Sequence, residues 1–161
     1  SQAFLPIVVK TAKLLHQSYT DRLTSVCVYG SVARGTASET SDVDMLIVIE
    51  DLGGSVGRRL EELYAAIAPI EDERRFLSRN RVFTDLSFFP LSRNEASRFL
   101  PIYLDLIDEG IIVFDRKDFL NKILSQCRLL VVRTGGEKVA TRGGWFWRLD
   151  PDMPVGERIA V

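Results

Sequence analysis

The sequence has few of the residues that build metal clusters or covalent scaffolds. Two cysteines, Cys27 and Cys127, lie far apart in 161 residues, and His16 is the only histidine. This composition excludes a disulfide framework and a histidine-rich zinc site. Both cysteines fall in apolar segments, so we expect them to be reduced core residues. His16 falls in the first predicted helix, where we expect a structural role.

The chain also lacks a long apolar run and an excess of basic charge. No stretch reaches the about 18 consecutive apolar residues of a membrane-spanning helix, and we find no signal-peptide pattern. The net charge is −1, whereas nucleic-acid-binding proteins typically carry a basic excess or stripe. We therefore expect a cytoplasmic protein without a membrane or nucleic-acid partner.

Hydrophobic periodicity predicts alternating helices and strands in a single domain, residues 1–161. A composition of 46% hydrophobic and 27% charged residues indicates a folded chain. Helices are predicted at 3–22, 31–37, 56–68, 92–110 and 118–133, and strands at 25–29, 43–49, 81–90 and 111–114. Ser92 and Glu95 form a capping box, and Pro101 is expected to kink or split the helix that they open. This alternation predicts an α/β (α+β) fold with a mixed sheet.

The C-terminal section is less regular. Glycine pairs bracket residues 135–144, and residues 145–147 and 155–161 are predicted to be strand or hairpin pieces. Trp145 and Trp147 alternate as strand residues do. We expect them to pack against the core; stacking on a base or contact with a partner are the alternatives.

Two aspartates open the most apolar predicted strand. Side chains alternate along a strand, so Asp42 and Asp44 should project from the same face, roughly 6.5 Å apart. Adjacent carboxylates repel one another unless a cation neutralises them. Oxygen ligands of this kind suit Mg²⁺, which completes its coordination with water and substrate phosphates. The pattern therefore predicts a magnesium site; a cap or turn aspartate is the alternative.

A glycine–serine turn follows the preceding predicted strand. Gly30 allows the backbone to approach a ligand closely, and the Ser31 hydroxyl with the first N–H groups of a helix can bind phosphate oxygens. Ser31 could equally be a simple N-cap residue. Together with the two aspartates, this turn indicates chemistry on a nucleotide.

These residues resemble a known signature. Gly30-Ser31, ten intervening residues and Asp42-x-Asp44 are similar to the motif of the polymerase-β-like nucleotidyltransferase superfamily. The Ala33-Arg34-Gly35 stretch and Ser41 are most similar to the minimal nucleotidyltransferases (MNT type) of prokaryotes. The resemblance implies a sheet of about five strands with helices mainly on one face. It also implies a catalytic core at about 20–90 and a C-terminal extension at about 91–161.

The resemblance further implies a third carboxylate on a neighbouring strand. Asp85 is the candidate, because it interrupts an apolar stretch; an exposed edge position or a pair with a nearby arginine is the alternative. Asp42, Asp44 and Asp85 would then be the catalytic and metal-binding residues. They would hold two Mg²⁺ ions, or Mn²⁺ in their place, on ATP or another nucleoside triphosphate.

Other polar residues around the motif have weaker assignments. Gly30, Ser31, Arg34 and Ser41 are the nucleotide-binding candidates. Arg34 could reach a phosphate or lie free on the surface, and Ser41 could simply order the loop before Asp42. The sequence also contains a group of four arginines: Arg74, Arg75, Arg79 and Arg81. They could contact triphosphate or an acidic partner, although a solvated face balanced by acids at 71–73 is the simpler interpretation.

The sequence leads to an enzyme that moves a nucleoside monophosphate, AMP from ATP, onto a hydroxyl. The resemblance implies a tyrosine of a helical HEPN-type toxin partner as acceptor, with a small molecule such as an aminoglycoside as the alternative acceptor. A nucleotide-binding or antitoxin module without turnover is the alternative function. The sequence does not fix the acceptor, the base or the oligomeric state.

Overall fold

A mixed sheet forms the centre of the computed structural model, which describes residues 2–82, 84–142 and 144–160. Within these residues the sheet has four strands in the order β3-β2-β1-β4, where about five were expected. β1 is antiparallel to β2 and β4, and β2 is parallel to β3. The strands are β1 (Leu23–Tyr29), β2 (Val43–Ile49), β3 (Leu86–Ser92) and β4 (Ile111–Asp115). The predicted α/β (α+β) class with a mixed sheet is confirmed.

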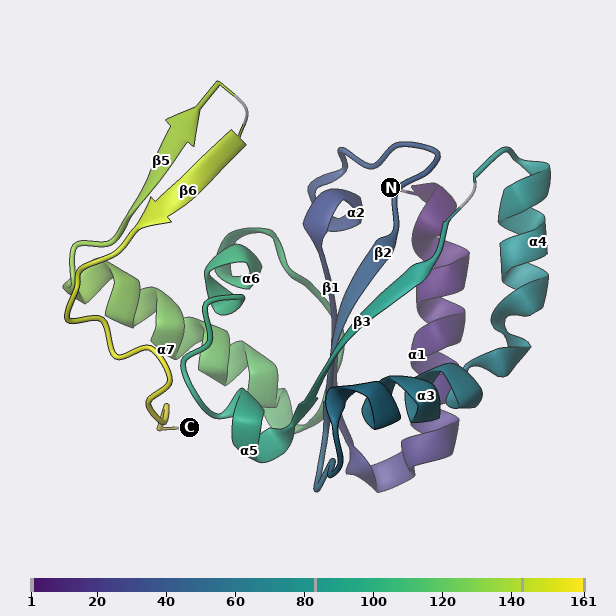
Figure 1. Ribbon diagram of the computed structural model, residues 1–161, viewed down its shortest axis with the longest axis horizontal. Coiled ribbons are helices and arrows are strands. Elements are labelled where there is room, and N and C mark those ends of the chain that lie inside the picture. Colours follow the sequence, from purple (N-terminus) through teal and green to yellow (C-terminus); the bar gives the residue numbers. More distant parts are fainter. Residues whose placement is uncertain (1, 83, 143, 161) are drawn as a thin grey trace.

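Helices cover both faces of this sheet, where we expected them mainly on one (Figure 1). α1, α3 and α4 lie on one side of β1–β3, and α5, α6 and α7 lie on the other. The α-helices are α1 (Leu5–Tyr19), α2 (Gly30–Arg34), α3 (Val56–Ala66), α4 (Glu71–Arg79), α5 (Arg93–Ala96), α6 (Tyr103–Glu109) and α7 (Phe119–Arg133). Short 3-10 turns occupy Gln2–Phe4, Thr20–Arg22, Ala68–Ile70 and Arg116–Asp118.

The alternation of side chains along β2 explains the two covered faces. Met45 and Ile47 are fully buried in the core under α1 and α3, while Leu46 and Val48 are fully buried in the core under α6 and α7. A strand that is buried on both faces appears in the sequence as a continuous apolar run. β2 has the bounds expected from that run, 43–49.

The helix predicted at 92–110 is split. The capping box of Ser92 and Glu95 is confirmed, but α5 ends at Ala96, and α6 begins only at Tyr103. Pro101 lies in the turn between them, as its missing N–H and fixed backbone angle favour. α4 is a helix that the sequence analysis did not assign. Its apolar residues are too few for a helical stripe, and they include Phe76, which is exposed.

The C-terminal section contains a hairpin of β5 (Glu137–Thr141) and β6 (Gly144–Arg148), which confirms strand structure at 145–147. Trp147 packs against the α6–α7 core and its indole N–H donates to the Leu104 carbonyl over 3.1 Å. In the described part of 155–161 there is an isolated bridge to Arg98 instead of the expected strand. Phe83, Gly143 and Val161, which fall in predicted strand or loop segments, lie outside the described residues.

Both cysteines are free and fully buried, which confirms the prediction of core residues. Burial raises the pKa of each thiol to about 12. Among the described helices, none has the length and apolar character needed to cross a bilayer.

Candidate active site

Asp42 and Asp44 stand at the start of β2 and share one face of the sheet. They have the parity of Leu46 and Val48, which are buried against α6 and α7. The two acids therefore face the α6 side, at the end of the sheet where no helix covers them fully. Asp42 is exposed and Asp44 is half-buried. Parity along the strand predicted the shared face, but the packing of the helices decides which face it is.

Gly30 forms a gap that the Asp44 carboxylate fills. Tyr29, the last residue of β1, is paired with Asp44, and α2 begins directly after it at Gly30. Gly30 has φ +71°, and a Cβ added there would lie 2.5 Å from Asp44 Oδ2. A side chain at this position is therefore excluded twice, by the left-handed backbone and by the carboxylate. The glycine of the turn and the aspartate of the strand form one local unit.

The surroundings of Asp44 disfavour its charge. Partial burial raises the pKa of the Asp44 carboxyl, and the neighbouring Asp42 charge raises it further. A hydrogen bond with Ser87 and the charge of Arg34 lower the pKa and offset part of this effect. Two carboxylates that repel each other on a partly desolvated face are a donor set that suits a hard divalent cation. The pair therefore fits the Mg²⁺ that the sequence predicted.

Asp85 lies beside Asp42, but its carboxylate is directed elsewhere. The parallel register pairs Val43 with Leu86, so Asp42 and Asp85, which directly precede β2 and β3, are neighbours. The Val43 N–H donates to the Asp85 carbonyl over 2.9 Å, and the Asp85 N–H lies 3.4 Å from Asp42 Oδ1. The exposed Asp85 carboxylate forms an ion pair with Arg74 of α4. This is the arginine pair that the sequence analysis kept as an alternative.

The structure thus brings two of the three predicted acids together. Across the residues described, no group of three or more histidine, cysteine, aspartate or glutamate side chains is placed to hold a metal ion. Asp42 and Asp44 are neighbours through the strand, and Asp85 is their neighbour only through its backbone. A metal role for Asp85 stays a prediction that requires its carboxylate to leave Arg74.

Ser41 orders the loop that leads into β2. Its hydroxyl accepts a hydrogen bond from the Ser38 N–H over 2.9 Å, and its carbonyl accepts one from the Thr84 hydroxyl over 2.6 Å. Thr84 directly precedes Asp85, so this bond joins the starts of β2 and β3. Ser31 lies in the first turn of α2, next to Gly30, and is half-buried. These contacts position Asp42, and they favour the loop-ordering interpretation of Ser41.

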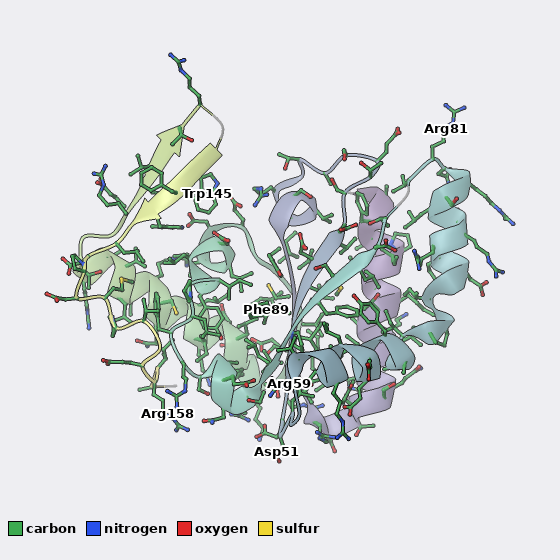
Figure 2. All side chains as sticks on the ribbon, in the orientation of Figure 1. Asp51, Arg59, Arg81, Phe89, Trp145 and Arg158 are labelled. Carbon is green, nitrogen blue, oxygen red and sulfur yellow. The ribbon has the colours of Figure 1, made fainter. Side chains whose placement is uncertain are left out.

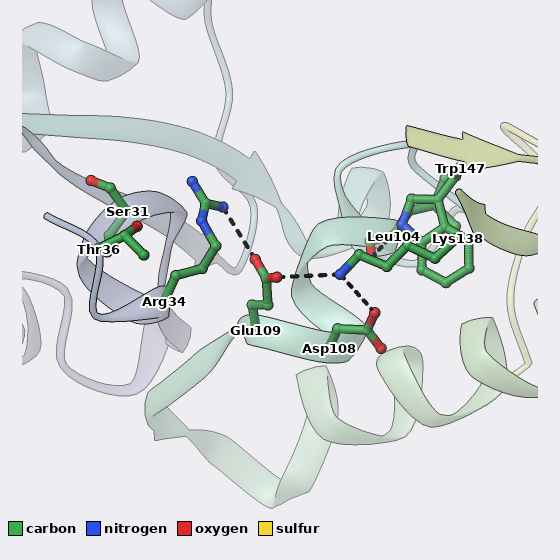
Figure 3. Close-up of polar contacts among 8 residues, drawn as sticks. All are labelled: Ser31, Arg34, Thr36, Leu104, Asp108, Glu109, Lys138 and Trp147. Carbon is green, nitrogen blue, oxygen red and sulfur yellow. Dashed lines mark hydrogen bonds and ion pairs between the residues drawn. The ribbon is translucent and has the colours of Figure 1, made fainter. Parts of the chain in front are cut away.

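Arg34 belongs to a charge network that the sequence did not reveal (Figure 3). Its guanidinium pairs with Glu109 of α6 over 3.1 Å, and Glu109 also pairs with Lys138 of β5 over 3.2 Å. Lys138 contacts Asp108 over 3.2 Å as well. Arg34 and Glu109 are 75 positions apart. No local pattern could have linked them, because the contact depends on how α6 packs on the sheet.

The arginines of α4 line a cleft next to Asp85. Arg74, Arg75 and Arg79 form one wall, Thr84 and Asp85 form another, and the cleft measures about 540 Å³. Tyr64 of α3 supports the start of β3, since its hydroxyl donates to the Leu86 carbonyl over 2.8 Å. Its pKa is raised by burial first and then by the charges of Asp85 and Asp42. The carboxylates thus lie beside a basic cleft.

Comparison with solved structures gives several alignments. Spectinomycin adenyltransferase AAD(9) from Enterococcus faecialis, with ATP and spectinomycin, aligns with a TM-score of 0.52 and 14% identity, over 73% of this chain and 58% of that chain. A toxin–antitoxin structure with AMP-PNP aligns with a TM-score of 0.46 and 19% identity, over 80% of this chain and 92% of that chain. A tri-AMPylated Shewanella oneidensis HEPN toxin in complex with MNT antitoxin aligns with a TM-score of 0.41 and 17% identity, over 81% of this chain and 92% of that chain. At these identities the likeness to AAD(9) concerns the fold alone.

Comparison with curated protein sequences gave no significant match. The family model described as "Nucleotidyltransferase domain" matches residues 9–131, which is more than half of the chain. The matched range contains Gly30, Ser31, all three candidate aspartates and the whole central sheet, but not the β5–β6 hairpin. The chain therefore belongs to the nucleotidyltransferase domain family, and the expectation of a nucleotidyltransferase is confirmed.

Proposed function

We propose that this nucleotidyltransferase moves AMP from ATP onto a hydroxyl acceptor, with Mg²⁺ held at Asp42 and Asp44. The observation that carries the proposal is the packing of Asp44 against the Cβ-free position of Gly30. This contact joins the acid pair to the start of α2, so cation and phosphate sites would be neighbours. Bound Mg²⁺ would supply charge neutralisation at the triphosphate and favour ionisation of the acceptor hydroxyl.

The reaction is a substitution at the α-phosphorus. The acceptor oxygen forms a bond to that phosphorus, the bond to the oxygen that bridges the α- and β-phosphates breaks, and pyrophosphate leaves. Asp85 is proposed to take the acceptor proton, because it lies on the outer side of Asp42, away from α2. Ser31 and Arg34 are proposed to bind the phosphates that leave. The chain's contribution is mainly positioning, as expected for phosphoryl transfer.

The arrangement of the strands separates these two roles. β2 carries the acid pair, β1 with α2 lies on one side of it, and β3 with Asp85 lies on the other. A leaving group on the α2 side and an acceptor on the β3 side would approach the phosphorus from opposite directions. In-line substitution requires that arrangement.

The acceptor is proposed from the family resemblance. A tyrosine hydroxyl of a helical HEPN-type partner is the first candidate, and a small molecule such as an aminoglycoside is the second. One observation favours a different function, a nucleotide-binding or antitoxin module without turnover: the Asp85 carboxylate pairs with Arg74. A protein that keeps this pair in the presence of nucleotide would bind without transferring.

Label transfer separates the two functions. The protein is incubated with Mg²⁺ and ATP radiolabelled at the α-phosphate, together with cell lysate or with an aminoglycoside panel. We expect a labelled protein band, with the label on tyrosine by mass spectrometry; a labelled small molecule would indicate the second acceptor. Asp44→Asn should abolish the transfer.

Asp21→Asn is the matched control, because Asp21 is exposed and lies beyond the opposite end of β1. It should transfer as the wild type does. Binding of ATP without transfer to any of these acceptors would support the module instead. Transfer that survives Asp44→Asn would refute the assigned site.

A further inference from the structure

An aromatic cleft lies between the C-terminal hairpin and the end of α2. It measures about 750 Å³, within the range of small-molecule sites. The hairpin contributes Trp145, Phe146 and Trp147, and the rest of the lining is Arg34, Thr36, Pro101, Leu104 and Asp105. Aromatic and apolar walls with a few polar groups are typical of sites for planar ligands. The hairpin lies beyond the residues that the family model matches.

This cleft opens on the same side of the sheet as the catalytic acids. Asp44 faces the α6 side, and α6 supplies Leu104 and Asp105 to the cleft. Burial first, and then the charges of Asp44 and Asp105, raise the pKa of Tyr29 to about 12, so this one side chain lies near both acids. Arg34 likewise acts on Asp44 and on Asp105. Tyr29, the strand partner of Asp44, directly precedes α2, and Arg34 at the end of α2 lines the cleft, so one short segment of the chain joins the two sites.

The hairpin is fixed to this position by specific contacts. Lys138 of β5 pairs with Glu109, which pairs with Arg34 of α2 (Figure 3). The Lys138 ammonium also lies 3.8 Å from the centre of the Trp145 ring. Figure 2 shows Trp145 on the side of the hairpin that faces α2. The aromatic wall is thus held next to the residues proposed to bind phosphate.

We propose that this cleft binds the nucleobase of the substrate nucleoside triphosphate, stacked on the Trp145 side of the hairpin. The inference rests on the proposed function, which places the departing β- and γ-phosphates at Ser31 and Arg34. The base is joined to them through the ribose and the α-phosphate, and Arg34 lines the cleft as well as the proposed phosphate site. A nucleobase offers the flat face that an aromatic wall stacks on, and its N–H groups can donate to the Asp105 carboxylate.

The two tryptophans make the proposal directly measurable. Both tryptophans of the chain lie in this hairpin. Trp147→Phe keeps an aromatic ring at the packed position and leaves Trp145 as the only fluorophore of its kind. We expect saturating Mg²⁺–ATP to quench Trp145 fluorescence. Tripolyphosphate, which has no base, should compete with ATP in calorimetry but should not quench.

Binding constants give the second measurement. Stacking of one base on an aromatic side chain corresponds to roughly 5- to 150-fold in affinity. Trp145→Ala should weaken the binding of ATP by a factor in that range and leave the dissociation constant of tripolyphosphate within about twofold of the wild-type value. Trp145→Phe, which keeps a ring, should lose less than Trp145→Ala. Thermal unfolding of each variant shows whether it is folded.

Two results would overturn the inference, and they differ from a failure of the proposed function. If ATP binds but Trp145 is not quenched, or if Trp145→Ala weakens ATP and tripolyphosphate equally, the base does not lie in this cleft. If neither ATP nor tripolyphosphate binds the wild type in Mg²⁺, the proposed function itself is wrong.

Discussion

Replacing Gly30 by alanine tests the contact on which the candidate site depends. The new Cβ would lie 2.5 Å from Asp44 Oδ2, where ordinary contacts begin at 3.4 Å, so the carboxylate has to move by about 0.9 Å. A displacement near 1 Å at a reacting centre corresponds to a loss of about 10²-fold in rate. We therefore expect Gly30→Ala to reduce label transfer from ATP about 100-fold.

The backbone strain of this change has a matched control in Gly35→Ala. Gly35 has φ +73°, close to the +71° of Gly30, but a Cβ there meets nothing within 4 Å. Each alanine should cost about 1–2 kcal/mol through its left-handed backbone, which is a fall of about 2–8 °C in Tm for a chain of this size. Both variants should lose that stability, and Gly35→Ala should keep its transfer activity.

Calorimetric Tm and the initial rate of label transfer, measured on the same preparations, separate strain from contact. Equal losses of activity in the two variants would show that the strained turn matters and that the Asp44 contact does not. A folded Gly30→Ala protein with normal activity would refute the reasoning altogether.

Three further substitutions test other contacts by thermal unfolding. Glu95 has its pKa lowered, first by hydrogen bonds from Arg59, so its stabilisation is present at neutral pH and is lost as the pH falls through the folded-state pKa. Because the Glu95 side chain is 43% exposed, Glu95→Gln should lower the Tm at neutral pH by only about 3 °C, and the difference from wild type should vanish in acid. Asp44 has a raised pKa, so without metal Asp44→Asn should raise the Tm at neutral pH, with the gain shrinking as acid protonates the wild type; a lower Tm would contradict this. Arg74→Gln breaks an exposed pair with Asp85 and should change the Tm by less than about 4 °C, whereas a larger fall would mean that the pair is structural.

The strands could be predicted where apolar runs are bounded by polar or turn residues. β2 has the bounds expected, because two acids precede its run and the whole run is buried. The layers could not be predicted, since a run buried on both faces does not say which helices cover each. α4 was missed because helix formation there depends on one buried residue, Leu77, and on packing against α1. The mostly polar sequence of α4 shows no apolar periodicity that would predict a helix.

In the candidate site too, local geometry could be predicted from the sequence and tertiary contacts could not. The shared face of Asp42 and Asp44 follows from strand parity, and the turn at Gly30 follows from its place after an apolar run, so short-range geometry predicts both. The packing of Asp44 against Gly30 could not be predicted, because it depends on how β1 pairs with β2. The partners of Arg34 and Asp85 could not be predicted, because Glu109 and Arg74 reach them through tertiary packing. The aromatic cleft had only a weak signal, the alternation of two tryptophans.

The parity of β2 also limits how this chain can change in length. The loop between α2 and β2 can gain or lose a residue with little loss of stability, because the side chains of β2 would still point to the same faces of the sheet. A single insertion between Asp44 and Leu46 would instead rotate every later side chain by half a turn or push both aspartates into the apolar layer under α1. Variation in length near the candidate site is therefore expected in the loop between α2 and β2, and β2 itself should be intolerant of even one added residue.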